Sequence, residues 1–166
     1  KLTNPPGAWG GVDHEKGIAW RAVTGIDHAE GKEFPRLWGG IDYGVPLPWP
    51  NSSVWAYGQA GIVGGDSESP LGALYFGSFR NNYVDNRTEK RYRELEAFPG
   101  FEIDQIAARK FGNLTGEINL PPVRFEEVGT AAFFLSYARP AMFGGAMLLS
   151  SPEDRSYRLF SLGAQV

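Results

Sequence analysis

The sequence predicts an all-β fold, and three observations support this prediction. Gly and Pro together make up 34 of the 166 residues, which is typical of a chain with many turns and too many for a helical bundle. Hydrophobic residues make up 42% of the chain, enough to form a folded core. Apolar residues recur with a period of two along most of the chain, whereas the spacing of an amphipathic helix is scarce.

Eight segments show the strand pattern. The clearest is residues 112–120, where Leu114, Gly116 and Ile118 alternate with polar residues, so that one face is apolar and the other is wet. In chain order the predicted strands cover residues 18–27, 37–47, 54–62, 71–79, 101–109, 112–120, 133–143 and 159–166. Predicted turns lie at residues 46–53, 64–70, 121–130 and 150–156, and the longest connection, 80–99, is polar and charged. No shift in composition divides the chain, so we predict one domain over residues 1–166.

Two antiparallel architectures produce such alternation, a soluble β-sandwich and a transmembrane β-barrel. A tilted strand needs about 9–11 residues to cross a bilayer, whereas strands of soluble proteins are most often about 5–6 residues long. Several predicted strands reach the longer range. Aromatic residues near strand ends also suit the interface girdles of a barrel; these are Trp38, Trp49, Trp55, Phe125 and Phe143. Strand length and aromatic placement therefore favour the transmembrane barrel.

Composition and charge exclude several classes of function. The formal net charge is −3 and basic residues cluster only at 87–93, so we predict no nucleic-acid partner. The chain has no Cys, and therefore neither disulfides nor thiolate metal ligands. His14 and His28 lack the spacing of a metal motif, and no Gly-x-Ser-x-Gly sequence presents a nucleophilic serine. We therefore predict no catalytic residue, no metal site, no cofactor and no enzymatic activity.

The long connection contains the strongest cluster of basic residues. Arg87, Arg91 and Arg93 are candidate contacts for phosphate groups such as those of lipopolysaccharide, because guanidinium groups match phosphate oxygens. Four acidic residues interleave with them: Asp85, Glu89, Glu94 and Glu96. The same arginines therefore also suit internal ion pairs that would hold the loop in place.

One part of the chain resembles a known family. Residues 75–143, with Phe-Gly-Ser-Phe-Arg-Asn-Asn-Tyr-Val-Asp at 76–85 and Arg-Tyr-Arg-Glu at 91–94, resemble the C-terminal outer-membrane barrel of bacterial surface-antigen proteins of the BamA superfamily, of the kind found behind TolB-like propellers. In that superfamily a long loop carries an Arg-Gly-aromatic signature, and a following strand ends in Glu, alternating apolar residues and Pro.

The two signature elements have counterparts here. Phe98, Gly100 and Phe101 resemble the loop signature, and residues 117–121 resemble the strand end. Pro99 stands where the signature has Arg. The resemblance therefore implies that the ion pair between loop and lumen, typical of the transport members, cannot form from position 99.

The resemblance implies an integral outer-membrane β-barrel segment of a Gram-negative bacterium. It would serve as a membrane anchor or pore wall, linked to protein assembly or transport. Its expected partners are outer-membrane lipid, other strands or domains of the same protein, and a periplasmic protein. About eight strands can close a small barrel, but the superfamily barrel is about twice that size, and the alternation is still running at residues 163–166. The chain would then form half of a larger barrel.

Two other functions stay open. A secreted β-sandwich module would bind carbohydrate by stacking sugar rings on exposed aromatic side chains. The candidates for that role are Trp9, Trp20, Trp38, Trp49 and Trp55. An outer-membrane enzyme such as a lipase would need a catalytic domain elsewhere in the polypeptide. The sandwich alternative predicts a protein that stays soluble without detergent.

Overall fold

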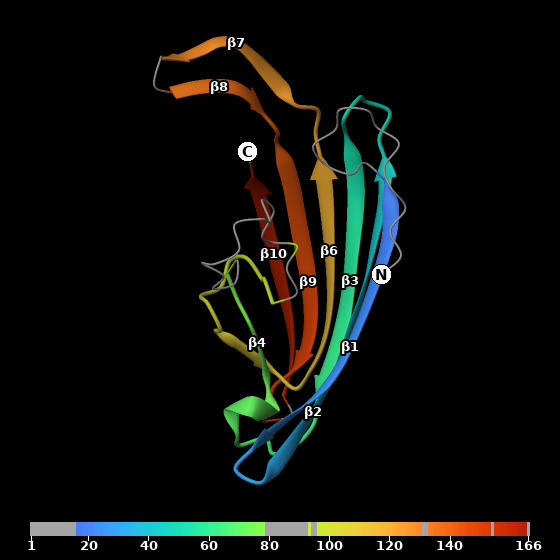
Figure 1. The fold of residues 1–166 in the computed structure, drawn as a ribbon, viewed down its shortest axis with the longest axis vertical. Coiled ribbons are helices and arrows are strands. Elements are labelled where there is room, and N and C mark those ends of the chain that lie inside the picture. The colour runs from blue at the N-terminus through green and yellow to red at the C-terminus, as the bar shows by residue number, and fades with distance from the viewer. Residues whose placement is uncertain (1–15, 79–92, 94–95, 131–132, 154, 166) are drawn as a thin grey trace.

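A computed structural model of the chain shows one large curved antiparallel sheet and two small two-stranded sheets (Figure 1). It describes residues 16–78, 93, 96–130, 133–153 and 155–165. The large sheet has six strands in the spatial order β1-β2-β3-β6-β9-β10, and all neighbours are antiparallel. These strands are β1 (Gly17–Ala29), β2 (Lys32–Pro46), β3 (Ser53–Val63), β6 (Lys110–Asn119), β9 (Ala141–Ser150) and β10 (Ser156–Gln165). Neighbours in the sheet therefore follow one another along the chain, as in an up-and-down meander.

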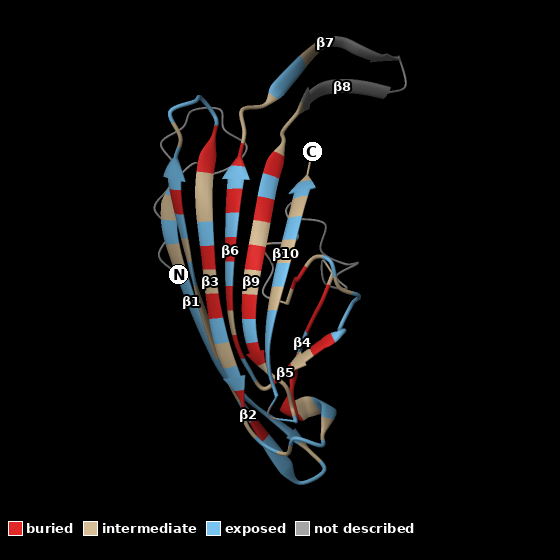
Figure 2. Ribbon diagram, turned by 180° about the vertical axis from the view of Figure 1, so that it is seen from behind, coloured by how far each residue is buried: buried red, intermediate tan, exposed pale blue. Residues whose placement is uncertain are grey.

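The alternating residues of each strand point to opposite faces of this sheet, and the two faces differ in burial. In β6 the odd-numbered residues from Phe111 to Asn119 are buried, and Leu114, Gly116 and Ile118 between them are exposed. Figure 2 shows this alternation as bands along the strands. Residues opposite one another in antiparallel strands share a face, so the register extends both faces across all six strands. We call the face of Leu114 the convex face and that of Glu117 the concave face.

The connection between β3 and β6 folds back over the concave face (Figure 1). It contains a 3-10 helix at Pro70–Gly72 and the short pair β4 (Leu74–Phe76) and β5 (Ile106–Ala108). Phe76, Phe98 and Ile106 of this connection pack with Phe111 and Met147 of the sheet in one buried cluster. The hydrophobic core therefore lies between the sheet and its own long connection.

A second hairpin extends beyond the sheet at the end where β6 stops and β9 begins. It consists of β7 (Val123–Thr130) and β8 (Phe133–Ala138), which pair with a register shift between Arg124 and Val128. At its base the N–H of Leu120 donates to the carbonyl of Pro140 at 3.0 Å. The hairpin therefore leaves the sheet and returns to it at one place.

The turn between β1 and β2 is the tightest in the large sheet. Glu30 and Gly31 form it with φ angles of 52° and 74°. Two central residues with positive φ are the mark of a type I′ hairpin turn, whose twist matches that of the flanking strands. The turn thus fixes the register of the two longest strands.

The structure confirms an all-β antiparallel fold and corrects some predicted bounds. Predicted strand 133–143 is two strands, because the chain leaves β8 before Pro140 and enters β9 at Ala141. Residues 141–150 and 123–130 are strands, although the sequence placed a turn at 121–130 and predicted no strand between residues 143 and 150. Predicted strands 71–79 and 101–109 contain only the three-residue β4 and β5. The structure describes ten strands, six of them in the large sheet, where the sequence predicted about eight along the chain.

The described part of the large sheet is open, with β1 and β10 as its two edges. A closed barrel is not formed within the described residues. The only helical element described is the three-residue turn at Pro70–Gly72, and no described helix could span a membrane.

Candidate functional site

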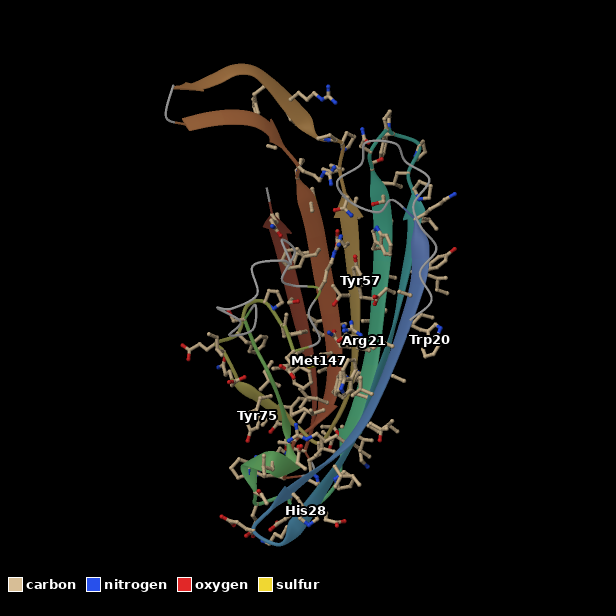
Figure 3. The ribbon with its side chains drawn as sticks, in the orientation of Figure 1. Trp20, Arg21, His28, Tyr57, Tyr75 and Met147 are labelled. Carbon is tan, nitrogen blue, oxygen red and sulfur yellow. The ribbon has the colours of Figure 1, made fainter. Side chains whose placement is uncertain are left out.

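The convex face is the first feature that points to a function. Exposed large apolar side chains occupy it on all six strands. They are Ile18, Trp20, Ile26, Leu37, Ile41, Tyr43, Val45, Ile62, Leu114, Ile118, Met142, Leu148, Phe160 and Leu162. Leu162 is 88% exposed and Phe160 75% exposed, so nothing in the described structure covers this end of the face. Figure 3 shows Trp20 pointing away from the side on which Tyr57 and Met147 lie.

The charged residues of the convex face lie at one end of it. Register and strand alternation place four ionisable side chains there, His28, Glu33, Lys110 and Arg158, all near the β1–β2 turn end of the sheet. From Leu37 to Val45 along β2, this face carries only Leu, Gly, Ile, Tyr and Val. Eight residues of strand span about 27 Å. Along β2 the convex face is therefore uncharged over about 27 Å, whereas on β6 and β10 Lys110 and Arg158 lie in the rows of Leu37 and Gly39.

The concave face has the opposite character in its upper half, toward the β7–β8 hairpin. Six buried polar residues lie there, beside the buried Tyr57, Ala141 and Phe143: Ser53, Gln59, Asn113, Thr115, Glu117 and Asn119. The Nδ2 of Asn119 lies 3.2 Å from the Oγ of Ser53 across the β3–β6 pair. Such a row of buried polar groups is stable only with hydrogen-bond partners. The sheet thus places its polar groups on the covered side.

Glu117 and Arg93 form the central ion pair of the concave face. Glu117 is only 1% exposed, whereas the Arg93 side chain is 25% exposed. The Nε of Arg93 donates to Oε2 of Glu117 at 2.7 Å, and its Nη2 donates to Oε1 at 2.5 Å. A guanidinium that binds both carboxylate oxygens makes the strongest and most directional of these pairs. This contact joins the long connection to strand β6.

Tyr57 of the neighbouring strand β3 contacts both members of this ion pair. Its hydroxyl donates to Oε2 of Glu117 at 3.1 Å, and the Arg93 guanidinium lies 5.5 Å from its ring centroid. Trp55 stacks against the Tyr57 ring at 6.0 Å with an interplanar angle of 9°. Hydrogen bonding and a cation–π contact therefore both hold Arg93 over the sheet.

The lower half of the concave face is filled by apolar residues of the long connection. Phe98 is 1% exposed and lies in the core cluster, and its ring centroid is 5.4 Å from that of Phe101. Gly100 between them has a φ of +99°, a conformation that favours glycine. A Cβ on Gly145 of β9 would stand 3.7 Å from the Phe98 ring, an ordinary van der Waals distance, so this ring lies close over the sheet at Gly145. The connection therefore plugs this half with hydrophobic packing.

The predicted site residues have different positions in the structure. Phe98, Gly100 and Phe101 lie together in the plug, and Arg93 lies on Glu117. Arg87 and Arg91 lie outside the described residues, so the predicted phosphate contacts stay a prediction. An ion pair between loop and sheet forms from Arg93, six residues before Pro99. The sequence resemblance did not identify Arg93 as the donor of such a pair.

Three of the aromatic residues predicted to form girdles do not lie on the exposed convex face. Trp38, Trp55 and Phe143 lie on the concave face, where the register places them in rows with Phe111 and Glu117. Trp49 is exposed in the β2–β3 turn. On the convex face the aromatic residues are Trp20, Tyr43 and Phe160. Periodicity shows which residues share a face but not which face is covered, and for this reason the sequence misplaced them.

Within the described residues, no cluster of three or more His, Asp or Glu side chains could hold a metal ion. Comparisons with known proteins found no relative, because no family model, no curated protein and no solved structure matches this chain. The resemblance to surface-antigen barrels therefore stays a prediction from the residues themselves.

Proposed function

We propose that the six-stranded sheet is a segment of an outer-membrane β-barrel that anchors the protein and forms part of the barrel wall. The observation that carries this proposal is the reversal of the two faces. The uncovered convex face is apolar, whereas the covered concave face is polar around Glu117. A barrel in a bilayer has this arrangement, with apolar residues toward lipid and polar residues toward the lumen.

The size of the exposed apolar face supports a lipid environment. Monomeric soluble proteins rarely expose contiguous apolar patches larger than a few hundred Å². Here large apolar side chains follow one another across all six strands. Exposing them to water is unfavourable by about 25 cal/mol for each Å². Contact with lipid removes this penalty.

Strand length and backbone pairing agree with the same environment. The six strands are 10 to 15 residues long, and a tilted strand needs about 9–11 residues to cross the hydrocarbon. Unpaired backbone groups are not tolerated in lipid. In this proposal the edges of β1 and β10 are therefore paired with further strands, from the same protein or from a partner.

The long connection determines whether this part of the proposed barrel would be open to solutes. It fills the concave side with the Phe98 plug and is tied to β6 through Arg93. A loop that occupies the lumen prevents free passage of solutes through that part of a barrel. We therefore propose an anchor and a plugged wall, not an open pore.

The test is membrane partitioning in a Gram-negative host. The chain is expressed with an export signal, the envelope is fractionated, and the extracted protein is run on gels with and without heating. The proposal predicts recovery in the outer membrane and a heat-dependent shift in gel mobility. A monomeric protein in the aqueous fraction, with a cooperative thermal transition, would contradict it and would make carbohydrate binding the next assay.

Two arginine variants make the test specific for the convex face. Leu114→Arg puts a charge in the middle of the apolar band, and Ser156→Arg adds the same residue at its end. A barrel in lipid should lose about 2–4 kcal/mol of stability with Leu114→Arg and about 0–1 kcal/mol with Ser156→Arg. Both positions are exposed, so equal and negligible losses would indicate an aqueous surface.

A further inference from the structure

Two cations stand at the lower end of the convex face, on strands β6 and β10. Lys110 is the first residue of β6, and Arg158 is the third residue of β10. Both side chains are exposed, and neither makes an ion pair with any residue that the structure describes. A pair of free cations at the edge of an apolar face has no role in the fold described above.

The register brings these cations together with two hydroxyl groups. Ser150 of β9 lies opposite both Lys110 and Ser156, and Arg158 lies opposite Leu148, one step further along the same face. Adjacent strands are about 4.8 Å apart, so Lys110 and Arg158 start from strands about 10 Å apart. All four side chains border one hollow of about 370 Å³. Long cationic side chains can reach a common ligand across it.

A second hollow continues from the first toward the middle of the sheet. It has a volume of about 650 Å³, and Leu148 lines both hollows. Its floor consists of small residues on the convex face, Gly58, Ala60, Gly112 and Ala146, with Ile41 and Leu114 standing at its sides. The face therefore has a shallow apolar channel that begins at the cationic end.

We propose that this surface binds one membrane lipid that carries a phosphate group. The phosphate lies between Lys110 and Arg158 with the serine hydroxyls as further donors, and an acyl chain lies in the hollow over Gly112. This inference rests on the proposed function, because it requires the convex face to lie in a membrane. It assigns the phosphate contact to strand residues, separately from the arginines of the long connection.

The chemistry of the two hollows identifies a lipid and not a free anion. Arg binds phosphate oxygens through paired donors, and Lys supplies a compact charge. Both side chains extend from an apolar strand toward the interface, where headgroups lie. Free phosphate would use only the cationic hollow, whereas a lipid also fills the apolar channel.

The test uses the detergent-extracted, heat-modifiable protein and native mass spectrometry with added lipids. The probes are phosphatidylglycerol, lipid A, diacylglycerol, which lacks phosphate, and inorganic phosphate. The double variant Lys110→Gln/Arg158→Gln removes both cations. Its matched control, Lys16→Gln/Arg155→Gln, removes two exposed cations that border neither hollow.

The expected result is preferential binding of the phosphate-bearing lipids by the native chain. The double variant should weaken this binding about 25-fold, because each cation contributes about fivefold, whereas the control should change it less than about threefold. Gly112→Leu should also weaken lipid binding, since a Cβ at Gly112 meets nothing within 4 Å and the side chain would fill the channel. It should leave heat-dependent mobility unchanged.

Other outcomes separate this proposal from the proposed function. A heat-modifiable protein whose native and double-variant forms bind phosphatidylglycerol equally would overturn the lipid site and leave the barrel wall intact. Competition by inorganic phosphate as strong as that by phosphatidylglycerol would overturn the lipid as the ligand. An aqueous monomer with no heat-dependent shift would overturn both proposals.

Discussion

The same six strands form both faces of the large sheet, but the two faces differ in which kinds of residue are exposed and which are buried. The convex face carries Leu114 and Leu162 in the open, whereas the concave face buries Glu117 beneath the long connection. In a soluble sheet the covered face is the apolar one. Burial and hydrophobicity coincide in the core cluster at the lower end of the concave face, but they are separated around Glu117 and on the convex face. The membrane environment that we propose for the convex face would account for that separation.

The concave face itself has two halves, and they are held in different ways. The lower half depends on hydrophobic packing of Phe98 and its neighbours. The upper half depends on the pair between Arg93 and Glu117, with Tyr57 beside it. These two attachments of the long connection to the concave face are of different kinds, and each can be removed separately.

The largest loss of stability is expected when the apolar packing of Phe98 is removed. Phe98→Ala should lower the free energy of unfolding by about 3–5 kcal/mol, because it removes a buried aromatic ring and leaves a cavity. Urea unfolding followed by tryptophan fluorescence measures this change. The exposed Ile103 of the same connection provides the control, since Ile103→Ala should cost less than about 1 kcal/mol. Equal losses at both positions would mean that the connection does not pack on the sheet.

The polar attachment should give the next largest effect. Arg93→Ala removes the guanidinium from a buried carboxylate and should cost about 3 kcal/mol. The exposed pair of Arg155 and Glu153, 3.5 Å apart, is its counterpart, and Arg155→Ala should cost less than about 1 kcal/mol. A double-mutant cycle with Glu117→Ala isolates the coupling. A coupling near zero would contradict the role given to this pair.

The hairpin turn of β1 and β2 should give a smaller effect. Gly31 has a φ of +74°, and a Cβ there would meet nothing within 4 Å. Gly31→Ala should therefore cost only the backbone preference, about 1 kcal/mol. The same unfolding measurement detects it. A loss above about 3 kcal/mol would show that the turn is packed against a part of the barrel that the described residues do not include.

The smallest change in stability is expected at Asp66, and it depends on pH. Lys32 Nζ lies 2.7 Å from Oδ2 of Asp66, and this hydrogen bond holds the pKa of Asp66 below its usual value of 3.8. The group therefore stabilises the fold fully above pH 3.8, and this contribution is lost as pH falls through the lowered pKa. Asp66→Asn should be slightly less stable than the native chain near neutral pH and equal to it in acid. A difference that grows in acid would have the wrong sign.

Much of the sheet could be predicted from the sequence, because alternation is a local property. The strict alternation from Asn113 to Asn119 gave β6 and its two faces. Strand β9 was harder to recognise. Pro140 ends the preceding strand, while Gly144, Gly145 and Ala146 carry little hydrophobic signal. Sequence patterns therefore revealed strands with large apolar residues better than strands made of small ones.

The candidate site could be predicted only in part. The sequence drew attention to Phe98 and Arg93, but it could not show that Arg93 reaches Glu117, 24 residues further along the chain, or that Tyr57 lies beside it. The pairing of β3 with β6 brings these residues together across the long connection. Likewise, Lys110 and Arg158 share a hollow only because of the register of β9 between them.

The contact between the convex face and lipid is the central claim, and spin labelling tests it most directly. The chain has no Cys, so Leu114→Cys and Leu148→Cys each provide a unique attachment point on that face, and Glu153→Cys provides an exposed turn position. In reconstituted membranes, labels at 114 and 148 should collide with dissolved oxygen more than with a water-soluble nickel complex, and the label at 153 should show the reverse. Preferential collision with nickel at all three positions would contradict the claim.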